Sequence, residues 1–469
     1  MMTAMALTRR AFLGTAPAGL MRGQAGGRRP NVLFLLGDDH RWDALGCMGN
    51  RIIQTPNIDG LSRSGVTFEN NFVTTAICVT SRASIFSGLY ARNHGILAFN
   101  QQFTREQFDR TYPAQLRKAG YRTGFVGKYG LDGDELPSDR FDYWRGFRGQ
   151  GKYFPKGEPG PHLTEIMSEQ AVEFIDGSKG DEPFCLSVSF KAPHVEDDDP
   201  RQFLYDPRDE ALYRDVTIPM PRTADPKYIS MLPLSVQRSE ARRRWAVRFA
   251  TPALYQESVK SYVRLVTGID RAVGAMLKAL DARGLRENTV IVYTGDNGFY
   301  LSEHGLAGKW FMHEESIRTP LIVNDPRTSR LRGARLKQMS LNIDIAPTLL
   351  DMAGVKGGAA MQGRSLIPAL RGSREAWRSE FFYEHNFAHA WIPKTEGVRD
   401  SRWKYTKYVS NKPAEEELYD LQADPLEERN LSGAAAQAGE MKRLRARHAA
   451  WVQALEGWDA TRKWVDPAQ

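Results

Sequence analysis

The strongest constraint on this chain is a set of short apolar runs, each followed by glycine or polar residues. The first run covers residues 31–36 (Asn-Val-Leu-Phe-Leu-Leu) and ends at Gly37. Similar runs cover residues 124–126, 184–190, 290–293 and 320–323. Because a continuous apolar run has no polar face, each run predicts a strand that is buried on both faces of a sheet.

Helical patterns lie between these runs. Residues 254–282 repeat apolar side chains at three- and four-residue spacing, and shorter helices are expected at 111–119 and 344–352. The alternation predicts an α/β fold with a large, mostly parallel sheet flanked by helices.

The chain has 469 residues, enough for one large domain and a smaller one. We expect a catalytic domain over residues 29–375, with a long polar insertion at 196–250 that lacks a clear period. Residues 376–469 are expected to form a C-terminal α+β subdomain with a small antiparallel sheet and a terminal helix. The net charge of +8 is spread along the chain, which favours an anionic substrate and gives no indication of nucleic-acid binding.

Residues 1–28 are predicted to be a removable export signal. Residues 7–13 (Leu-Thr-Arg-Arg-Ala-Phe-Leu) resemble a twin-arginine signal, and small residues follow. No later run approaches the roughly 20 apolar residues of a membrane span. We therefore expect the twin-arginine export machinery as a partner and a periplasmic or secreted protein.

Acidic residues follow two of the predicted strands. Asp38 and Asp39 come after the first strand, and Asp296 and Asn297 come after the fifth. Because ligands bind beyond the carboxyl ends of parallel strands, these side chains are expected to converge. An all-oxygen ligand set indicates a calcium or magnesium site.

Cys78 begins another predicted helix. With only three cysteines, the chain has no disulfide framework. A helix N-terminus favours an anion, and Arg82, Lys128 and Lys309 could add positive charge. A metal and several cations around one nucleophile suit a sulfate or phosphate group.

The segment Cys78-Val-Thr-Ser-Arg82, followed by Ala-Ser-Ile-Phe-Ser-Gly-Leu-Tyr, resembles the sulfatase signature. Five further motifs of that family follow the expected order. They are Asp38-Asp39, Gly127-Lys128-Tyr129, Lys191-Ala-Pro-His194, Asp296-Asn297-Gly298 and Gly308-Lys309. The segment 141–151 is similar to that of bacterial sulfatases acting on sulfated polysaccharides and N-acetylglucosamine 6-sulfate.

The resemblance implies a sulfuric ester hydrolase that removes sulfate from an organic ester, carbohydrate being the expected substrate class. A maturation enzyme would convert Cys78 to formylglycine. The implied Ca2+ ligands are Asp38, Asp39, Asp296, Asn297 and the modified Cys78. Arg82 and Lys128 would hold the formylglycine hydrate, and His194 and Lys309 would contact the sulfate and the leaving oxygen.

Two positions depart from the family pattern. Thr80 stands where proline is usual, which could limit maturation. Gly130 stands where many sulfatases have a histidine, and His94, His304 or His313 could replace it, with His304 the candidate for a supporting role.

Two other readings stay open. One is a phosphonate or phosphodiester hydrolase of the same alkaline phosphatase-like superfamily. The other is an inactive protein that binds sulfated glycans. Aromatic and basic residues of the insertion and the C-terminal part could form a sugar-binding rim or could join the two parts of the chain; they are Arg242, Arg243, Arg244, Trp245, Tyr383, His385, His389 and Trp391.

Overall fold

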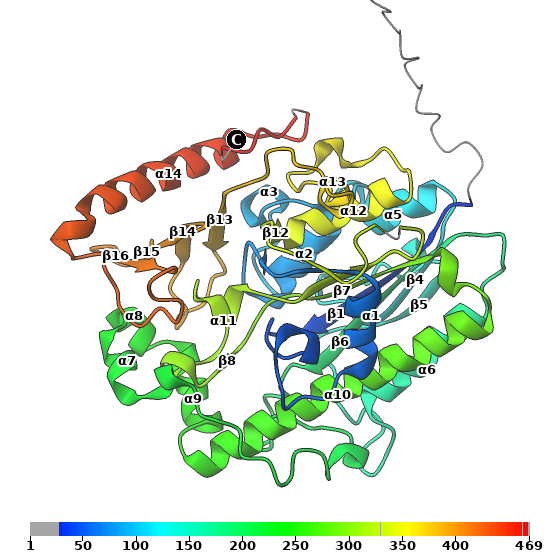
Figure 1. The fold of residues 1–469 in the computed structure, drawn as a ribbon, viewed down its shortest axis with the longest axis horizontal. Helices are drawn as coiled ribbons and strands as arrows, with labels where there is room; N and C mark the ends of the chain where they lie inside the picture. Colours follow the sequence, from blue (N-terminus) through cyan, green and yellow to red (C-terminus); the bar gives the residue numbers. More distant parts are fainter. Residues whose placement is uncertain (1–27, 329, 462, 468–469) are drawn as a thin grey trace, which may run out of the picture.

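The computed structural model describes residues 28–328, 330–461 and 463–467. Its central sheet has eight strands in the order β11-β2-β10-β7-β1-β6-β4-β5 (Figure 1). In chain order these are β1 (Asn31–Asp38), β2 (Val66–Phe68), β4 (Arg122–Lys128), β5 (Tyr143–Phe147), β6 (Phe184–Pro193), β7 (Thr289–Gly295), β10 (Leu321–Asn324) and β11 (Ala334–Leu336). The strands from β7 to β5 are parallel, and β10 is antiparallel to both of its neighbours.

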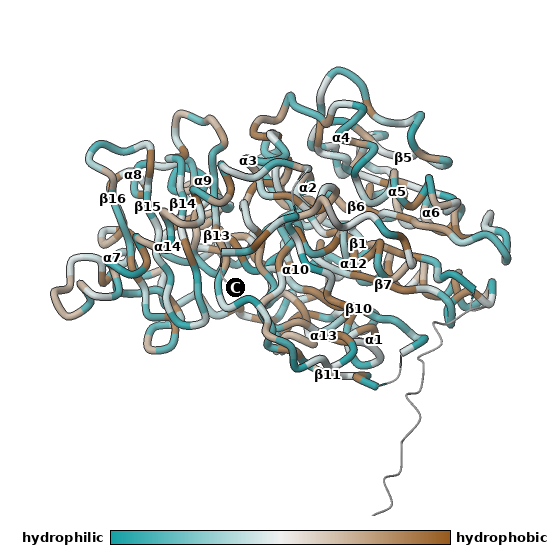
Figure 2. Tube along the Cα trace, turned by 90° about the horizontal axis from the view of Figure 1, so that it is seen from above, coloured by the Kyte–Doolittle hydropathy of each residue, from teal (hydrophilic) through white to brown (hydrophobic). Residues whose placement is uncertain are grey.

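Alternate residues of β1 belong to two hydrophobic cores, one on each face of the sheet. Val32 and Phe34 belong to the core that includes residues of α2 (Cys78–Ser87), α5 (Tyr112–Lys118) and α12 (Ile345–Met352). Leu33 and Leu35 belong to the core with α6 (Leu163–Asp176) and α10 (Pro252–Ala282). Figure 2 shows brown, hydrophobic chain concentrated in the central strands. The predicted α/β fold is confirmed.

Shorter elements connect these layers. The helices are α1 (Pro56–Ser64), α3 (Ala91–His94), α4 (Arg105–Asp109), α11 (Glu314–Ile317) and α13 (Ile367–Leu370). Two small sheets pair β3 (Asn71–Phe72) with β12 (Ser340–Leu341), and β8 (Tyr300–Leu301) with β9 (Ala307–Gly308).

The insertion at 196–250 contains regular structure that its sequence pattern did not indicate. It forms α7 (Pro226–Met231), α8 (Leu234–Gln237) and α9 (Glu240–Arg248). These helices have 6, 4 and 9 residues, which is too short for an apolar repeat to stand out. Of the three, α9 packs against β9, directly before Lys309.

The C-terminal part is a four-stranded antiparallel sheet covered by one helix (Figure 1). The strands are β13 (Glu380–His385), β14 (Thr395–Asp400), β15 (Trp403–Tyr408) and β16 (Glu415–Asp420), and the helix is α14 (Ala438–Glu456). This matches the smaller α+β unit expected from the sequence. The domain limits at residues 29, 375 and 376 stay a prediction. Apart from Arg28, the expected export segment lies outside the described residues.

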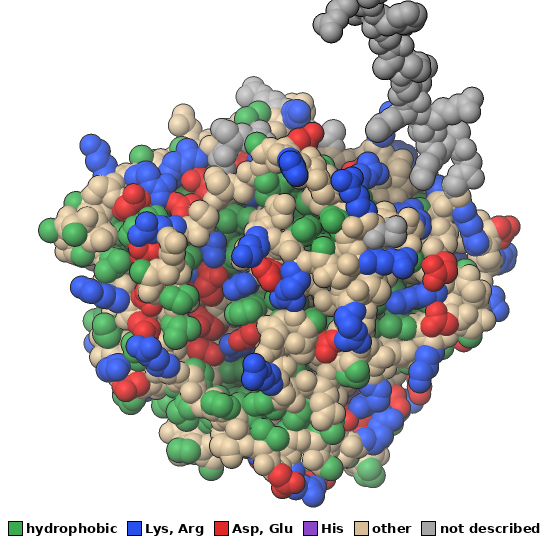
Figure 3. All heavy atoms as spheres, in the orientation of Figure 1, with side chains coloured by type: hydrophobic (Ala, Val, Ile, Leu, Met, Phe, Trp, Pro, Cys, Tyr) green, Lys and Arg blue, Asp and Glu red, His purple; other side chains and the backbone are tan. Residues whose placement is uncertain are grey.

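On the face seen in Figure 3, Lys and Arg side chains are scattered, and several acidic side chains lie together in a hollow. Within the part of the chain that the structure describes, no helix is both long and apolar enough to cross a bilayer.

Candidate active site

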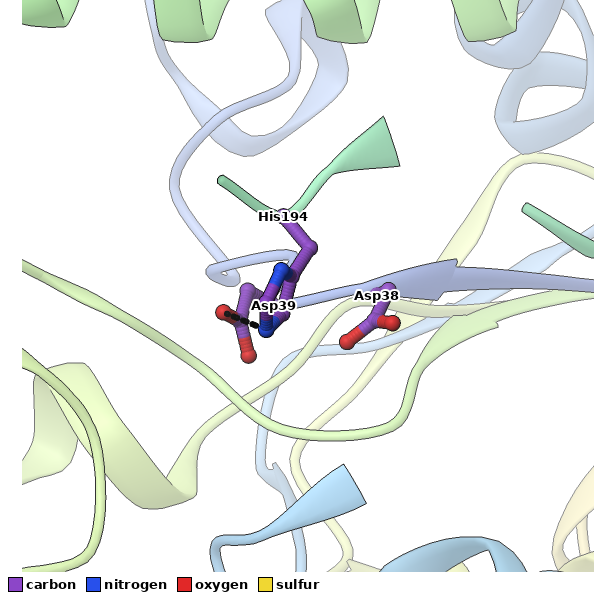
Figure 4. A group of neighbouring side chains, drawn as sticks. All are labelled: Asp38, Asp39 and His194. Atoms are coloured by element: carbon purple, nitrogen blue, oxygen red, sulfur yellow. Dashed lines mark ion pairs between the residues drawn. The ribbon is translucent and has the colours of Figure 1, made fainter. Parts of the chain in front are cut away.

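Four of the candidate residues lie at the same edge of the central sheet. Asp38 is the last residue of β1, and Lys128 is the last residue of β4. His194 and Asp296 directly follow β6 and β7. Because these strands are parallel, their carboxyl ends meet, as the sequence predicted. Figure 4 shows Asp38 and Asp39 at the end of β1 with the His194 ring beside them.

The four acidic and amide side chains form one cluster. The backbone N–H of Asp39 donates to Oδ1 of Asp296 at 3.0 Å. Asn297 Nδ2 donates to Oδ1 of Asp39 at 2.7 Å. Asp38, Asp39 and His194 each offer a ligand atom within 4.8 Å of the others. The two loops that follow β1 and β7 are therefore held together at the candidate metal site.

The cluster has ligand atoms that a cation could use. Asp38 Oδ1, Asp39 Oδ2 and Asn297 Oδ1 are buried and have no hydrogen-bond partner among the described residues. Leaving a buried polar atom without a partner costs about 1–3 kcal/mol. Three buried oxygens of this kind within one cluster fit a hard divalent cation such as Ca2+.

Arg82 connects the carboxylates to the helix that begins at Cys78. Its Nε donates to Oδ2 of Asp296 at 2.8 Å, and its NH2 lies 3.3 Å from Oδ2 of Asp38. Its NH1 donates to the hydroxyl of Ser189 and to the carbonyl of Lys128. The Arg82 side chain is 1% exposed. Its partners include residues of three strands of the central sheet, β1, β4 and β6.

Two lysines add positive charge. Lys128 Nζ forms an ion pair with Asp38 and donates to Oε1 of Gln150 at 2.6 Å. Lys309 Nζ forms an ion pair with Asp39. Burial lowers the pKa of Lys309, but Asp39 and the other nearby acidic groups together outweigh burial and raise the pKa above its ordinary value, so Lys309 carries its proton at neutral pH.

The pKa values of the three buried carboxylates are shifted in different directions by their neighbours. Burial raises the pKa of Asp296 to about 6, and the charge of Asp38 adds to the effect. Burial also raises the pKa of Asp39, although Lys309 opposes it. For Asp38, burial would raise the pKa, but Lys128 and the other nearby cationic groups together outweigh burial and hold the pKa well below its usual range. A bound cation would reduce the repulsion that Asp38 exerts on the other two.

Cys78 is the first residue of α2 and is 2% exposed. Ile77 is extended before it, so the helix starts at Cys78 itself. Burial raises the pKa of the Cys78 thiol, and the nearby charges of Lys128 and Lys309 only partly oppose this. The unmodified thiol therefore stays protonated and is a weak nucleophile at neutral pH.

His194 is neutral. Its Nδ1–H donates to the carbonyl of Val195 at 2.7 Å, and its Nε2 lies 3.6 Å from Oδ2 of Asp39. Burial lowers the pKa of His194 well below its ordinary value. With Nδ1 donating, Nε2 presents a lone pair toward the site.

Both positions that depart from the family pattern have a defined environment in the structure. Thr80 is buried in the first turn of α2, and its hydroxyl donates to the carbonyl of Ile96 at 3.0 Å. Gly130 has φ of +77°, and a Cβ there would lie 2.8 Å from Cδ of Arg82. Arg82 therefore occupies space that a side chain at position 130 would need.

The three histidines considered as substitutes have other neighbours. His94 Nε2 lies 3.1 Å from the Ser84 hydroxyl, and its Nδ1 accepts from the Ile96 N–H. The rings of His304 and His313 stack with centroids 4.6 Å apart. No hydrogen bond between described residues joins any of the three to Cys78 or the aspartates. The supporting role suggested for His304 stays a prediction.

Some of the proposed rim residues pack within the fold, and at least one is exposed. Tyr383 is buried, and its hydroxyl donates to the carbonyl of Trp310 at 2.7 Å. Trp245 Nε1 donates to the Ser302 hydroxyl at 2.9 Å. Trp391 is 51% exposed. The first two therefore join segments of the fold, and Trp391 is available to a ligand.

Two polar contacts of the site were not predicted from the sequence. Gln150 binds Lys128, and Ser189 binds Arg82. The Gly-Gln-Gly sequence around Gln150 was a usable signal, since glycines flank one polar side chain in a loop. Ser189 lies within an apolar run and gave none.

Comparison with known proteins identifies the class of enzyme. The sulfatase family profile matches residues 30–355, and the C-terminal profile of N-sulphoglucosamine sulphohydrolase matches residues 302–453. The chain therefore belongs to the sulfatase family, and the prediction of a sulfatase enzyme is confirmed.

Among its relatives is an N-acetylglucosamine-6-O-sulfatase of Bacteroides thetaiotaomicron, 30% identical over 89% of this chain and 85% of the relative. A solved structure, in complex with its substrate D-glucosamine-2-N,6-O-disulfate, superposes with a TM-score of 0.81 at 28% identity. It covers 93% of this chain and 100% of the other. A phosphonate monoester hydrolase from Silicibacter pomeroyi has a TM-score of 0.76 at 22% identity over 91% of this chain and 95% of its own, and it shares the fold.

Proposed function

We propose that the protein hydrolyses the sulfate ester of a carbohydrate, with a 6-O-sulfated glucosamine as the substrate class. The observation that carries the proposal is the position of Cys78, at the start of a buried helix among three carboxylates, two lysines and one arginine. The relatives that act on N-acetylglucosamine 6-sulfate and on glucosamine-2-N,6-O-disulfate support the choice of sugar.

The residues fit a calcium ion and a formylglycine. Asp38, Asp39, Asp296 and Asn297 would hold Ca2+, because three of their buried oxygens have no hydrogen-bond partner among the described residues. Bound Ca2+ would draw negative charge from the sulfuryl oxygens. Formylglycine made from Cys78 would supply, as its hydrate, one hydroxyl for attack on sulfur and a second for the release of sulfate.

Side chains of the protein would bind the formylglycine hydrate, donate a proton and orient the substrate. Arg82 and Lys128 place positive charge next to residue 78 and would hold its hydroxyl groups. Lys309 carries a proton that it can give to the leaving sugar oxygen. His194, neutral with Nε2 facing the site, would accept a hydrogen bond and orient the substrate. Fixed cations of this kind stabilise charge that develops on a sulfuryl group.

The decisive experiment is the mass of the tryptic peptide 64–82, which contains Cys78, from protein made with a maturation enzyme. We expect the mass of an aldehyde in place of the thiol, and sulfate release from glucosamine 6-sulfate. A Cys78→Ala variant is the control and should release none. An intact thiol in protein from the native host would instead support a sulfated-glycan binding protein.

Phosphonate and phosphodiester substrates, assayed in the same preparation, test the other superfamily activity. A higher kcat/KM for those esters than for sulfate esters would replace this proposal. We also propose export to the periplasm or beyond, which fractionation of the host would test.

A further inference from the structure

Two arginines of α9 lie beside the site. Arg244 and Arg248 are four residues apart on this helix and therefore lie on one face of it. Both bind the carboxylate of Asp197, with Arg244 NH1 at 3.0 Å and Arg248 NH2 at 2.6 Å. Asp197 lies three residues beyond His194, so the pair is anchored to the segment that carries a candidate catalytic residue.

Arg248 is buried but incompletely paired. Its side chain is 1% exposed, and its Nε donates to Oε1 of Gln202 at 2.9 Å. Its NH1 has no hydrogen-bond partner among the described residues. Burial lowers the pKa of Arg248 to about 10, so the group stays charged at neutral pH. A buried cationic donor without an acceptor is costly, and an anionic ligand would remove that cost.

The pair lies beside the segment that carries Lys309. The guanidinium of Arg244 lies over the ring of Trp310, 5.3 Å from its centroid, and Trp310 follows Lys309. The charge of Asp39 acts on Arg248, which places Arg248 within electrostatic reach of the aspartate cluster. Lys309 and His194 are the groups assigned to the leaving oxygen, so other substituents of the same sugar would extend toward α9.

We propose that Arg244 and Arg248 form a subsite for a second anionic substituent of the substrate, beside the sulfate ester that is hydrolysed. This inference rests on the proposed function. Arginine donates in a fork that matches the oxygens of a sulfate or a carboxylate. The anion is a second sulfate on the same sugar or the carboxylate of a neighbouring uronic acid. Asp197 and Glu240, which binds Arg244 Nε at 2.9 Å, together neutralise the pair in the free protein. The Asp197 side chain is 41% exposed and can turn to solvent when the anion binds.

The test measures binding, so that it does not depend on turnover. In a Cys78→Ala background, calorimetry at fixed ionic strength compares three probes. They are N-acetylglucosamine 6-sulfate, glucosamine-2-N,6-O-disulfate, and a disaccharide of N-acetylglucosamine 6-sulfate with a uronic acid. We expect at least one doubly charged probe to bind roughly 10- to 100-fold more tightly than the singly charged one. The preferred probe identifies the source of the anion.

Arg244→Gln and Arg248→Gln should each reduce this preference at least several-fold while leaving the affinity for the singly charged probe unchanged. Arg222→Gln is the control, because Arg222 belongs to the same insertion but is 72% exposed and pairs with Glu428 at 2.8 Å. Circular dichroism checks that each variant is folded. If Arg248→Gln unfolds, Arg244→Gln decides, because Arg244 is 28% exposed and tolerates the change more easily.

Equal binding of all three probes by the parent, or a full preference retained in the Arg244 variant, would overturn the subsite. Failure of the wild-type enzyme to release sulfate, with the preference intact, would refute only the proposed hydrolysis. The two proposals are therefore separable.

Discussion

Gly130→Ala tests whether Arg82 occupies the space used by a side chain at this position in other sulfatases. Gly130 has φ of +77°, where an alanine is strained, and its Cβ would lie 2.8 Å from Cδ of Arg82. Arg82 cannot move away freely, because its Nε is bound to Asp296 at 2.8 Å. We therefore expect the substitution to disturb both the backbone and the site.

The two effects have different sizes and different readouts. The left-handed backbone costs an alanine about 1–2 kcal/mol, which lowers the free energy of unfolding. Displacing Arg82 from Asp296 forfeits a charge-assisted hydrogen bond of about 1.5–3 kcal/mol. Since about 1.4 kcal/mol corresponds to a factor of ten, kcat/KM should fall roughly 10- to 100-fold.

Gly95→Ala separates the two effects. Gly95 has φ of +75°, and a Cβ there would meet nothing within 4 Å. This control should lose the same ~1–2 kcal/mol of stability in urea denaturation, with kcat/KM for glucosamine 6-sulfate unchanged. If Gly130→Ala retains the activity of Gly95→Ala, Arg82 does not occupy the critical space and the reasoning is wrong.

Three further predictions follow from the same structure. Thr80→Pro should raise the fraction of Cys78 converted to formylglycine, measured by peptide mass, at a cost of about 1 kcal/mol for the lost hydrogen bond to Ile96. An unchanged fraction would show that position 80 does not limit maturation. Added Ca2+ at 100 times its Kd should stabilise the protein by about 2.7 kcal/mol in denaturation experiments. Asp296→Asn should remove most of this gain, and a gain of equal size in the variant would argue against the site. Burial raises the pKa of Glu417 from 4.5 to about 7, so its contribution to stability is full below pH 4.5 and is lost as the pH rises through 7. Glu417→Gln should therefore gain stability relative to the wild type between pH 5 and pH 8, and a constant difference in urea denaturation would contradict the assignment.

The central strands could be predicted because their sequences leave few alternatives. Residues 31–36 and 290–293 have no polar face, so they can only lie inside a sheet that is covered twice. The structure extends these strands to Asp38 and Gly295, and the acidic pairs follow at the strand ends. Parallel order then brings the pairs together, which is why the candidate metal cluster could be predicted before any contact was known.

The hydrogen-bond partners of the site residues could not be predicted from the sequence. They come from distant segments whose residue pattern indicates only a buried strand or a loop. Ser189 belongs to a buried strand, and nothing in that strand indicates a contact with Arg82. His304 is five residues from Lys309, and this closeness suggested a shared site. Its ring stacks on that of His313, and its backbone has φ of 55°, neither of which the sequence spacing reveals.

The C-terminal subdomain is joined to the site through Tyr383 of β13. The Tyr383 hydroxyl accepts the N–H of Ala76 at 3.3 Å and donates to the carbonyl of Trp310 at 2.7 Å. Ala76 precedes Cys78 by two residues, and Trp310 directly follows Lys309. One buried hydroxyl thus links the segment that carries Cys78, the proposed nucleophile, to the segment that carries the proposed proton donor. Because the proposed catalysis requires these two groups at a constant separation, the subdomain would be part of the framework that positions them.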